Sequence, residues 1–265
     1  TKGSLKNKES LMDELLIGRL LPGSTRIDVG NINPVWRGNV LLQGYRRQMY
    51  VKSVPSRTLA VEVVCALMGR VLGLPIPRPA IVLVSPEALP GSHTENTLFF
   101  GSESVENPDL KQWMAKDHDG TIAHLMRWSK LIDAGCFDEL IANADRHGGN
   151  ILFGGNNKFS LIDHSEAMLP FISASDAAAQ NVLLQCASEG KQEKELHGVY
   201  TKAQAATYPY PAATISLQLI ATLEELTNST DASSLLEFLD QRIHSLMVLI
   251  SERIGYRQSA LVLKK

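Results

Sequence analysis

One stretch, ANADRHGGNILFGGNNKFSLIDHSEAM at residues 142–168, constrains the fold of this chain more than any other. It holds two short apolar segments, 151–153 and 159–162, on either side of a Gly-Gly-Asn-Asn turn. Two such segments joined by a tight turn predict a β-hairpin, whose open ends must then lie together. Polar residues occupy both open ends, so the hairpin either carries a solvated loop or gathers a site for a charged ligand.

The polar residues at the open ends have the composition of a magnesium site. Asp145 and Asn150 stand five residues apart, on a loop that leaves a predicted helix and enters the first strand, and Asp163 ends the returning strand. We therefore expect Asn150 beside Asp163, with Asp145 close by. An amide and a carboxylate side by side offer the hard oxygens that Mg²⁺ prefers, and this ion shares its shell with waters and substrate phosphates. Asp145 is then free to orient or deprotonate an attacking hydroxyl.

A lysine and a glutamate upstream form a second pattern. Lys52 lies within the predicted strand RQMYVKSV, and Glu62 follows ten residues later in a mostly apolar helical stretch. A buried glutamate needs a partner, and Lys52 is the candidate. A strand lysine paired with a glutamate of the next helix is how kinases hold the α- and β-phosphates of ATP.

The remaining hydrophobic pattern divides the chain into a strand-rich first part and a helical second part. A helix is predicted over about 56–72, with Ser56 as N-cap and Gly73 as C-cap, before the helix-breaking LPIPRP segment. Strands are predicted over 26–32, 39–43, 47–54, 80–84 and 97–101. Later helices are predicted over 121–134 and 136–144, separated by Gly135, and near 176–187, 213–226 and 233–254.

Composition excludes several classes of protein. With 44% hydrophobic and 20% charged residues the chain is an ordinary folded protein, and a net charge of −2 gives no basic field for nucleic acid or an anionic membrane. Its apolar runs are too short to span a bilayer, and its first residues lack a secretory pattern. The widely spaced Cys65, Cys136 and Cys186 are expected to be reduced core thiols, which indicates a cytoplasmic protein.

Histidine and aspartate pairs offer a different chemistry. His118-Asp119 and Asp163-His164, with His124 and His147, could ligate a divalent metal for phosphoester hydrolysis. The pair at 118–119 falls in KDHDGT, which is expected to be a solvated turn, and this chemistry gives no role to Lys52. Kinase-type chemistry therefore explains more of the pattern.

The order and spacing of these residues resemble the protein-kinase-like superfamily. Asp145 and Asn150 match the catalytic-loop pattern D-x-x-x-x-N, and Asp163 stands where the D-F-G aspartate stands, although residues 163–165 read Asp-His-Ser. The D-R-H-x-x-N variant resembles phosphoinositide-kinase-like and HipA-like kinases. The segments YVKSVPSRTLAVEVVCALMGRVLGLPIPRP, LFFGSE and LIDHSEAM are most similar to the bacterial HipA-like kinases, over about residues 30–168.

This resemblance implies a two-lobed α+β protein-kinase-like fold. Residues 1–101 would form a β-rich N-lobe and residues 102–265 a helical C-lobe with an embedded catalytic hairpin, with ATP between them. The implied activity is Mg²⁺-ATP-dependent phosphoryl transfer to a hydroxyl, with Ser or Thr of a protein substrate as acceptor. A lipid or small-molecule acceptor, nucleotidyl transfer on the same fold, and a nucleotide-binding pseudokinase remain alternatives. The resemblance also admits an antitoxin or regulatory protein as partner.

The resemblance implies a role for each site residue. Lys52 would bind the α- and β-phosphates and Glu62 would hold Lys52. Asp145 would be the catalytic residue, and Asn150 and Asp163 would bind Mg²⁺. Adenine would be read by backbone amides of a hinge at Phe100, Gly101 and Ser102. The atypical segment 31–40 would cover the phosphates, with contributions from Arg37 and Gly38. The supporting residues of the catalytic loop and the hairpin would be Arg146, His147 and His164.

Overall fold

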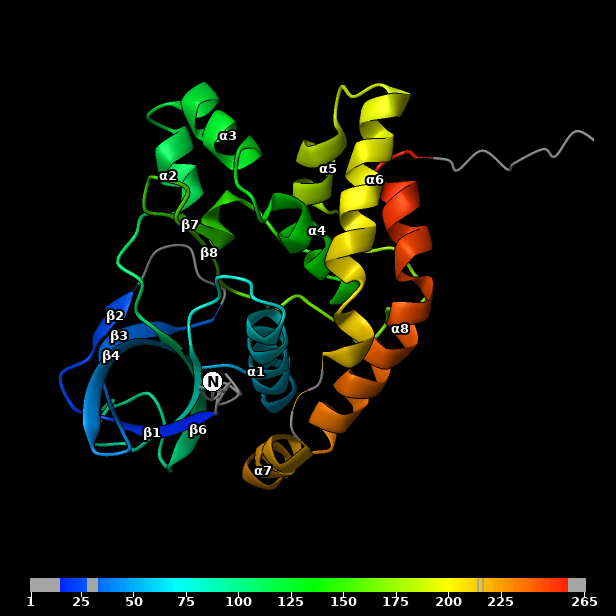
Figure 1. Cartoon of the computed structure of the whole chain (residues 1–265). Helices are drawn as coiled ribbons and strands as arrows, with labels where there is room; N and C mark the ends of the chain where they lie inside the picture. Colours follow the sequence, from blue (N-terminus) through cyan, green and yellow to red (C-terminus); the bar gives the residue numbers. More distant parts are fainter. Residues whose placement is uncertain (1–14, 28–32, 214, 216, 257–265) are drawn as a thin grey trace, which may run out of the picture. The chain divides into compact units, whose positions relative to one another are not determined.

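The computed structural model describes residues 15–27, 33–213, 215 and 217–256 (Figure 1). The chain divides into two compact units: unit 1 comprises residues 1–106 and 213–235, and unit 2 comprises residues 107–212 and 236–265. Strands dominate the first part of the chain and helices the second, which confirms the expected mixed α+β class. Within the described ranges, no helix is both long and apolar enough to cross a lipid bilayer.

The described part of unit 1 contains a six-stranded sheet that closes on itself. Its strands are β1 (Leu16–Leu20), β2 (Thr25–Ile27), β3 (Val35–Leu42), β4 (Tyr45–Lys52), β5 (Pro79–Val84) and β6 (Thr97–Glu103). Four strands follow one another in the order β5-β6-β4-β3. Strand β1 closes this row, because it pairs in parallel with β5 at one end and antiparallel with β3 at the other. The curl of the sheet is visible in Figure 1. The predicted strand 26–32 is described only up to Ile27, since residues 28–32 lie outside the described ranges.

Apolar side chains fill the inside of this closed sheet. Residues alternate between buried and exposed along β3, as the two-residue period of a strand requires. Trp36 on β3 packs against Phe99 on β6, with ring centroids 5.6 Å apart. The buried cluster around them includes Leu20, Val40, Leu42, Met49, Val51, Ala80, Val82 and Val84.

Helix α1 (Ser56–Val71) follows β4 and is buried along most of its length. Its start differs from the prediction: Pro55 occupies the N-cap position without a side-chain hydrogen bond, and Ser56 is the first helical residue. The fixed φ of proline suits this entry without a hydroxyl cap. At the other end Leu72 is the C-cap and Gly73, with φ +74°, follows it. The bonds from Gly73 N to Arg70 O and from Leu74 N to Gly69 O form a Schellman motif, which explains the glycine.

Two C-terminal elements complete unit 1. Helix α7 (Leu217–Thr227) packs against α1, and the first residues of α8 (Asp231–Arg253) belong to the same unit. Arg57 near the start of α1 forms an ion pair with Asp231, with Nη1 and Oδ1 3.3 Å apart. Both helices were predicted from the sequence to within a few residues.

Unit 2 consists of helices around the predicted hairpin. Its elements are α2 (Leu110–Met114), α3 (His118–Met126), α4 (Leu131–Leu140), η1 (Gly148–Asn150), β7 (Ile151–Phe153), β8 (Phe159–Leu161), α5 (Val182–Ser188), α6 (Glu193–Thr207), η2 (Tyr210–Ala212) and most of α8. The hairpin is confirmed, with Ile151 opposite Leu161 and Phe153 opposite Phe159.

Aromatic side chains fix this hairpin to its neighbours. The rings of Phe153 and Phe159 stack with centroids 4.5 Å apart, and Trp128 lies 4.9 Å from Phe159. Trp113 on α2 donates from Nε1 to the carbonyl of Phe153 over 2.8 Å. The hairpin is therefore held by packing and by a hydrogen bond from outside its own ladder.

The predicted helix break at Gly135 is wrong. Helix α3 ends at Met126, the break falls at residues 127–130, and α4 runs through Gly135. A Cβ at this position would lie 2.8 Å from Leu184 Cγ, and the Gly135 carbonyl accepts a 2.8 Å bond from Asn181 Nδ2. The glycine allows α5 to approach α4 closely. In the sequence, a glycine that serves close packing looks the same as a glycine that ends a helix.

Candidate active site

A buried ion pair joins strand β4 to helix α1 in unit 1. Lys52 is the last residue of β4, and Glu62 lies in the middle of α1. The Nζ of Lys52 and the Oε1 of Glu62 are 3.1 Å apart, and their side chains are only 12% and 1% exposed. Removing either partner would leave a charge in a poorly hydrated place, which costs several kcal/mol in comparable buried pairs (about 3–5). The structure therefore brings together the two residues that the sequence pattern paired.

The catalytic-loop candidate in unit 2 begins where α4 ends. Ala142 adopts φ +47°, its N–H bonds to Glu139 O, and the N–H of Asn143 bonds to Asp138 O. This is a Schellman ending with alanine where glycine is usual, so the backbone is held in a less favourable region. The side-chain oxygen of Asn143 then accepts a 3.1 Å bond from the backbone N–H of Asp145. These bonds fix where the loop places Asp145.

Arg146 is the buried centre of the loop. Its side chain is fully buried, and its Nε lies 3.0 Å from Oδ2 of Asp138, which is also fully buried. Its Nη1 donates to the carbonyl oxygens of Asn150 and Ile162, over 3.0 and 2.7 Å. One guanidinium thus ties α4 to the start of β7 and to the end of β8, which are the open ends of the hairpin.

Asn150 and Asp163 occupy these open ends. The backbone N–H of Ile162 donates to Asn150 O over 3.1 Å, and Asp163 follows at once. Asn150 donates from Nδ2 to Asp145 O over 2.9 Å, and no hydrogen bond from another described residue engages its amide oxygen. Asp163 adopts φ +55°, and its Oδ1 accepts a 2.8 Å bond from Ser165 Oγ. A residue other than glycine in the left-handed backbone region costs free energy, so this conformation of Asp163 persists only where its neighbours hold it.

The donor set at this end of the hairpin fits Mg²⁺. In the part of the chain that the structure describes, no three His, Cys, Asp or Glu side chains gather as a metal cluster. The described side chains therefore do not form a site in which the protein supplies every metal ligand. Mg²⁺ does not require one, because it binds through one or two protein oxygens while waters and substrate phosphates supply its other ligands. The amide oxygen of Asn150 is oriented by its own Nδ2 bond, which suits that demand.

The residues of the hydrolase alternative do not gather. His118 and Asp119 begin helix α3, where a solvated turn was expected, and their side chains are 64% and 102% exposed. His124 packs against the ring of Phe153 at 5.3 Å. Neither histidine is placed as a ligand.

The two supporting histidines have different surroundings. The Nδ1 of His147 accepts a 2.9 Å bond from Gly149 N, and its Nε2 lies 3.6 Å from Oδ2 of Asp145. Both of these side chains are about half exposed, at 53% and 50%. His164 is buried with its ring edge-on to Phe137, at 6.0 Å. His147 shapes the loop beside Asp145, and His164 packs behind Asp163.

The predicted hinge contacts do not fit Phe100, Gly101 and Ser102. All three lie inside β6 and pair on one side with β4 and on the other with β5. The backbone N–H and C=O groups of a strand with a partner on each side are already hydrogen-bonded within the sheet, so they are not available to adenine. At the end of β6 and just beyond it, the backbone N–H groups of Glu103 and Ser104 still bond to Arg78 and Gln48. Residues 105–106 are the first after the strand whose backbone makes no backbone hydrogen bond with another described residue.

The predicted phosphate loop is likewise a strand over most of its length. Residues 35–40 belong to β3, and residues 31–32 lie outside the described ranges. Arg37 donates from Nη2 to Gln48 Oε1 over 2.7 Å and pairs with the carboxylate of Glu106. A Cβ on Gly38 would overlap the Ser24 hydroxyl. The glycine therefore serves close packing within the sheet, and the Arg37 side chain is engaged by its own unit.

Comparison with solved structures shows a kinase fold. The chain is similar to the crystal structure of the Helicobacter pylori proinflammatory kinase CtkA, with a TM-score of 0.50 and 16% sequence identity over 87% of this chain and 97% of that one. The family model of the HipA-like kinases matches residues 45–206, more than half of the chain. The chain belongs to the HipA-like kinase family, as its motifs predicted. None of the curated proteins compared with the chain matches it.

Proposed function

We propose that this HipA-like kinase transfers the γ-phosphoryl group of Mg²⁺-ATP to a Ser or Thr hydroxyl of a protein substrate. The observation that carries the proposal is the buried 3.1 Å pair between Lys52 and Glu62. In kinases such a pair positions the lysine on the nucleotide phosphates. Family membership supports phosphotransfer in general, and the resemblance to HipA-like kinases motivates the protein acceptor.

In this proposal unit 1 acts as the N-lobe and unit 2 as the C-lobe of a two-lobed kinase. Lys52 would hold the α- and β-phosphates. Asn150 and Asp163 would hold Mg²⁺, which supplies charge neutralisation at the phosphates. Asp145 would orient the acceptor hydroxyl and accept its proton. We move the proposed adenine contact from β6 to the backbone of residues 105–106.

The cytoplasm is the proposed location, and an antitoxin or other regulatory protein the proposed partner. None of the three cysteines forms a disulfide, which fits a reducing compartment. The partner follows from the resemblance to the family alone.

The decisive experiment replaces Asp145 by asparagine. Transfer from γ-labelled ATP to a protein acceptor, or to the chain itself, should fall by about 10²–10⁴-fold, the range expected for losing a general base. Binding of a fluorescent Mg²⁺-ATP analogue should persist, because the proposed metal and phosphate ligands remain. Asp119→Asn, a fully exposed aspartate of the same unit, is the matched control. Near-normal transfer by the Asp145 variant would contradict the assigned role.

Product analysis separates the remaining alternatives. Mass spectrometry of the acceptor distinguishes an added phosphate from an added nucleotide, and so kinase from nucleotidyl transferase. A lipid or small-molecule kinase would leave every protein acceptor unmodified while consuming ATP in the presence of its own substrate. A pseudokinase would bind the nucleotide and give no product.

A further inference from the structure

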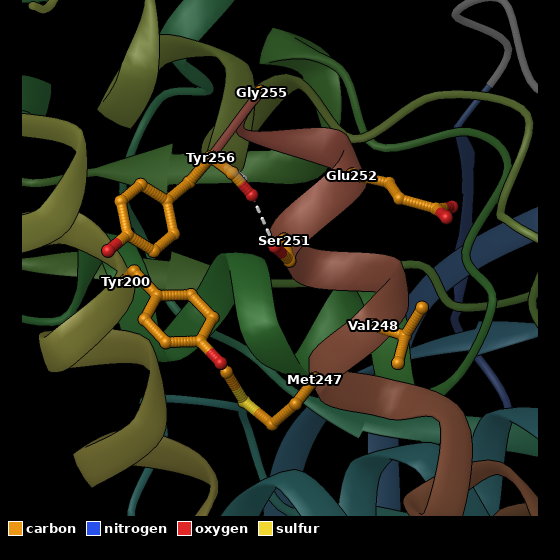
Figure 2. A pocket seen from close by; sticks show the side chains of 7 residues that line it. All are labelled: Tyr200, Met247, Val248, Ser251, Glu252, Gly255 and Tyr256. Carbon is orange, nitrogen blue, oxygen red and sulfur yellow. Dashed lines mark hydrogen bonds between the residues drawn. The ribbon is translucent and has the colours of Figure 1, made fainter. Parts of the chain in front are cut away.

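A groove of about 620 Å³ runs beside the last turns of α8 in unit 2, with one wall from α6 (Figure 2). Its lining residues are Tyr200, Met247, Val248, Ser251, Glu252, Gly255 and Tyr256. None of them belongs to the candidate active site. The volume lies within the range of about 300–1,000 Å³ that is typical of ligand clefts and exceeds the needs of a single small ion.

One wall of the groove is aromatic and is held in place. The rings of Tyr200 and Tyr256 lie 4.9 Å apart, tilted by 34°. The hydroxyl of Tyr256 is 2.9 Å from Nδ1 of His197, its N–H donates to Ser251 O over 3.0 Å, and its carbonyl accepts a bond from Ser251 Oγ. The wall is therefore ordered before a ligand arrives, which lowers the entropy that binding must lose.

The rest of the lining is partly apolar. Ser251 and Gly255 line the groove with a small side chain and with none. The sulfur of Met247 lies 3.3 Å from the Thr207 hydroxyl, which is also 2.9 Å from the Ala203 carbonyl, and Val248 is 60% exposed. Figure 2 shows the two tyrosines on one side of α8 and Val248 with Glu252 on the other, so the last turns of α8 lie between the aromatic and the acidic lining residues.

The acidic lining residue is Glu252, through its carboxylate. Among the lining residues it is the one with a formal charge at neutral pH. Its side chain makes no ion pair or hydrogen bond with any described residue. It also stands in the last turn of α8, where the helix dipole adds partial negative charge. The neighbouring Arg253 is used elsewhere, because its Nε lies 3.2 Å from Oε2 of Glu139.

We propose that this groove binds a basic polypeptide segment by one of its arginine or lysine side chains. The aliphatic stem would lie against the faces of Tyr200 and Tyr256, and the cationic head would reach Glu252. Aromatic faces attract cations, and long basic side chains bury their methylenes while the head stays near water. An anionic or purely apolar segment would leave the carboxylate without a partner. This binding does not depend on phosphoryl transfer.

The test is a binding titration on the full chain without nucleotide. The probe is the peptide Gly-Leu-Arg-Gly-amide with fluorescein on its N-terminus, followed by anisotropy, and its matched control carries citrulline, the neutral isostere of arginine. We expect the arginine peptide to bind about tenfold more tightly than the citrulline peptide, a ratio consistent with one cation–π and carboxylate contact. Added salt should weaken the arginine peptide more than the citrulline peptide.

Two variants assign the binding to the groove. Glu252→Gln should weaken the arginine peptide about tenfold, whereas Glu237→Gln, an exposed glutamate of the same helix, should not change it. Tyr200→Ala should weaken binding and Tyr200→Phe should preserve it, since the ring face is kept. Circular dichroism checks that each variant is folded.

Three results would overturn the proposal. The first is equal binding of the arginine and citrulline peptides. The second is an unchanged affinity in Glu252→Gln. The third is complete competition by methylguanidinium at equal concentration, which would identify a small-cation site and exclude a peptide-binding groove.

Discussion

Replacement of Arg146 by methionine removes the side chain that joins the two open ends of the hairpin. The change keeps an unbranched side chain of similar length, so packing is largely conserved. It removes the partner of the fully buried Asp138 carboxylate and the donor to the carbonyl oxygens of Asn150 and Ile162.

The magnitude follows from the burial of the pair. A buried ion pair broken on one side costs about 3–5 kcal/mol, because the remaining charge is neither hydrated nor paired. Asp138 keeps one hydrogen bond, from Asn143 Nδ2 at 3.1 Å, which limits the loss. We therefore expect unit 2 to lose about 4 kcal/mol of its free energy of unfolding, a large share of the 5–15 kcal/mol that is typical of a domain.

Tryptophan fluorescence during urea unfolding measures this loss where it occurs. Trp113 and Trp128 both contact the hairpin, and Trp36 lies in unit 1. In a Trp36→Phe background the signal therefore reports on unit 2. Arg127→Met, at an exposed arginine of the same unit, is the control and should change stability by less than about 0.5 kcal/mol.

A loss below about 1 kcal/mol would refute the assignment of Arg146 as the buried tie. A second variant tests the electrostatic reason for the loss. Asp138→Leu combined with Arg146→Met leaves no unpaired charge, so it should recover part of the stability lost in the single variant. If the double variant is no more stable than Arg146→Met, the unpaired Asp138 carboxylate is not the cause of the loss.

Two further substitutions and one chemical modification have clear outcomes. Lys52→Met should weaken the binding of a fluorescent Mg²⁺-ATP analogue at least about tenfold, and unaltered binding would remove this lysine from the nucleotide site. Gly135→Ala should lower the urea midpoint of unit 2 by the equivalent of about 1–3 kcal/mol, because the methyl group would overlap α5; an unchanged midpoint would refute the close packing. Burial raises the pKa of the Cys136 thiol far above neutrality, and that of the less buried Cys186 also rises. At pH 8 iodoacetamide should therefore modify Cys186 before Cys136 in the native protein, and the reverse order in a peptide map would contradict the burial.

The hairpin and the Lys52–Glu62 pair could be predicted because their signals are local. Alternating or continuous apolar residues, turn residues between them and a charged residue in an apolar helix all occur within short windows of sequence. The class of fold followed from the same signals, and the family followed from their order. The functional roles of Asp145, Asn150 and Asp163 stay predictions, and the structure shows the hydrogen bonds that place them.

The errors arose where a residue acts on a distant part of the chain. Gly135 and Gly38 have the composition of a break or a loop, yet each sits inside a regular element and makes room for a neighbour remote in sequence. Phe100, Gly101 and Ser102 were expected in a hinge, but partners on both sides keep them in the sheet. Helix α6 was missed because its sequence is polar, although Gln192 and Glu195 form a capping box at its start. Arg146 was expected only as a supporting residue of the loop, and the structure adds that it is buried and bonded to both open ends of the hairpin.

Unit 1 is assembled from two pieces of chain that are separated by more than one hundred residues. A ribosome must therefore synthesise all residues from α1 to the start of α8 before α7 can cover α1 and Asp231 can meet Arg57. Until then the apolar face of α1 lacks part of its native cover, and such transiently exposed surface is prone to aggregation. The chain also passes between the units three times, so no single protease cut separates them into complete domains.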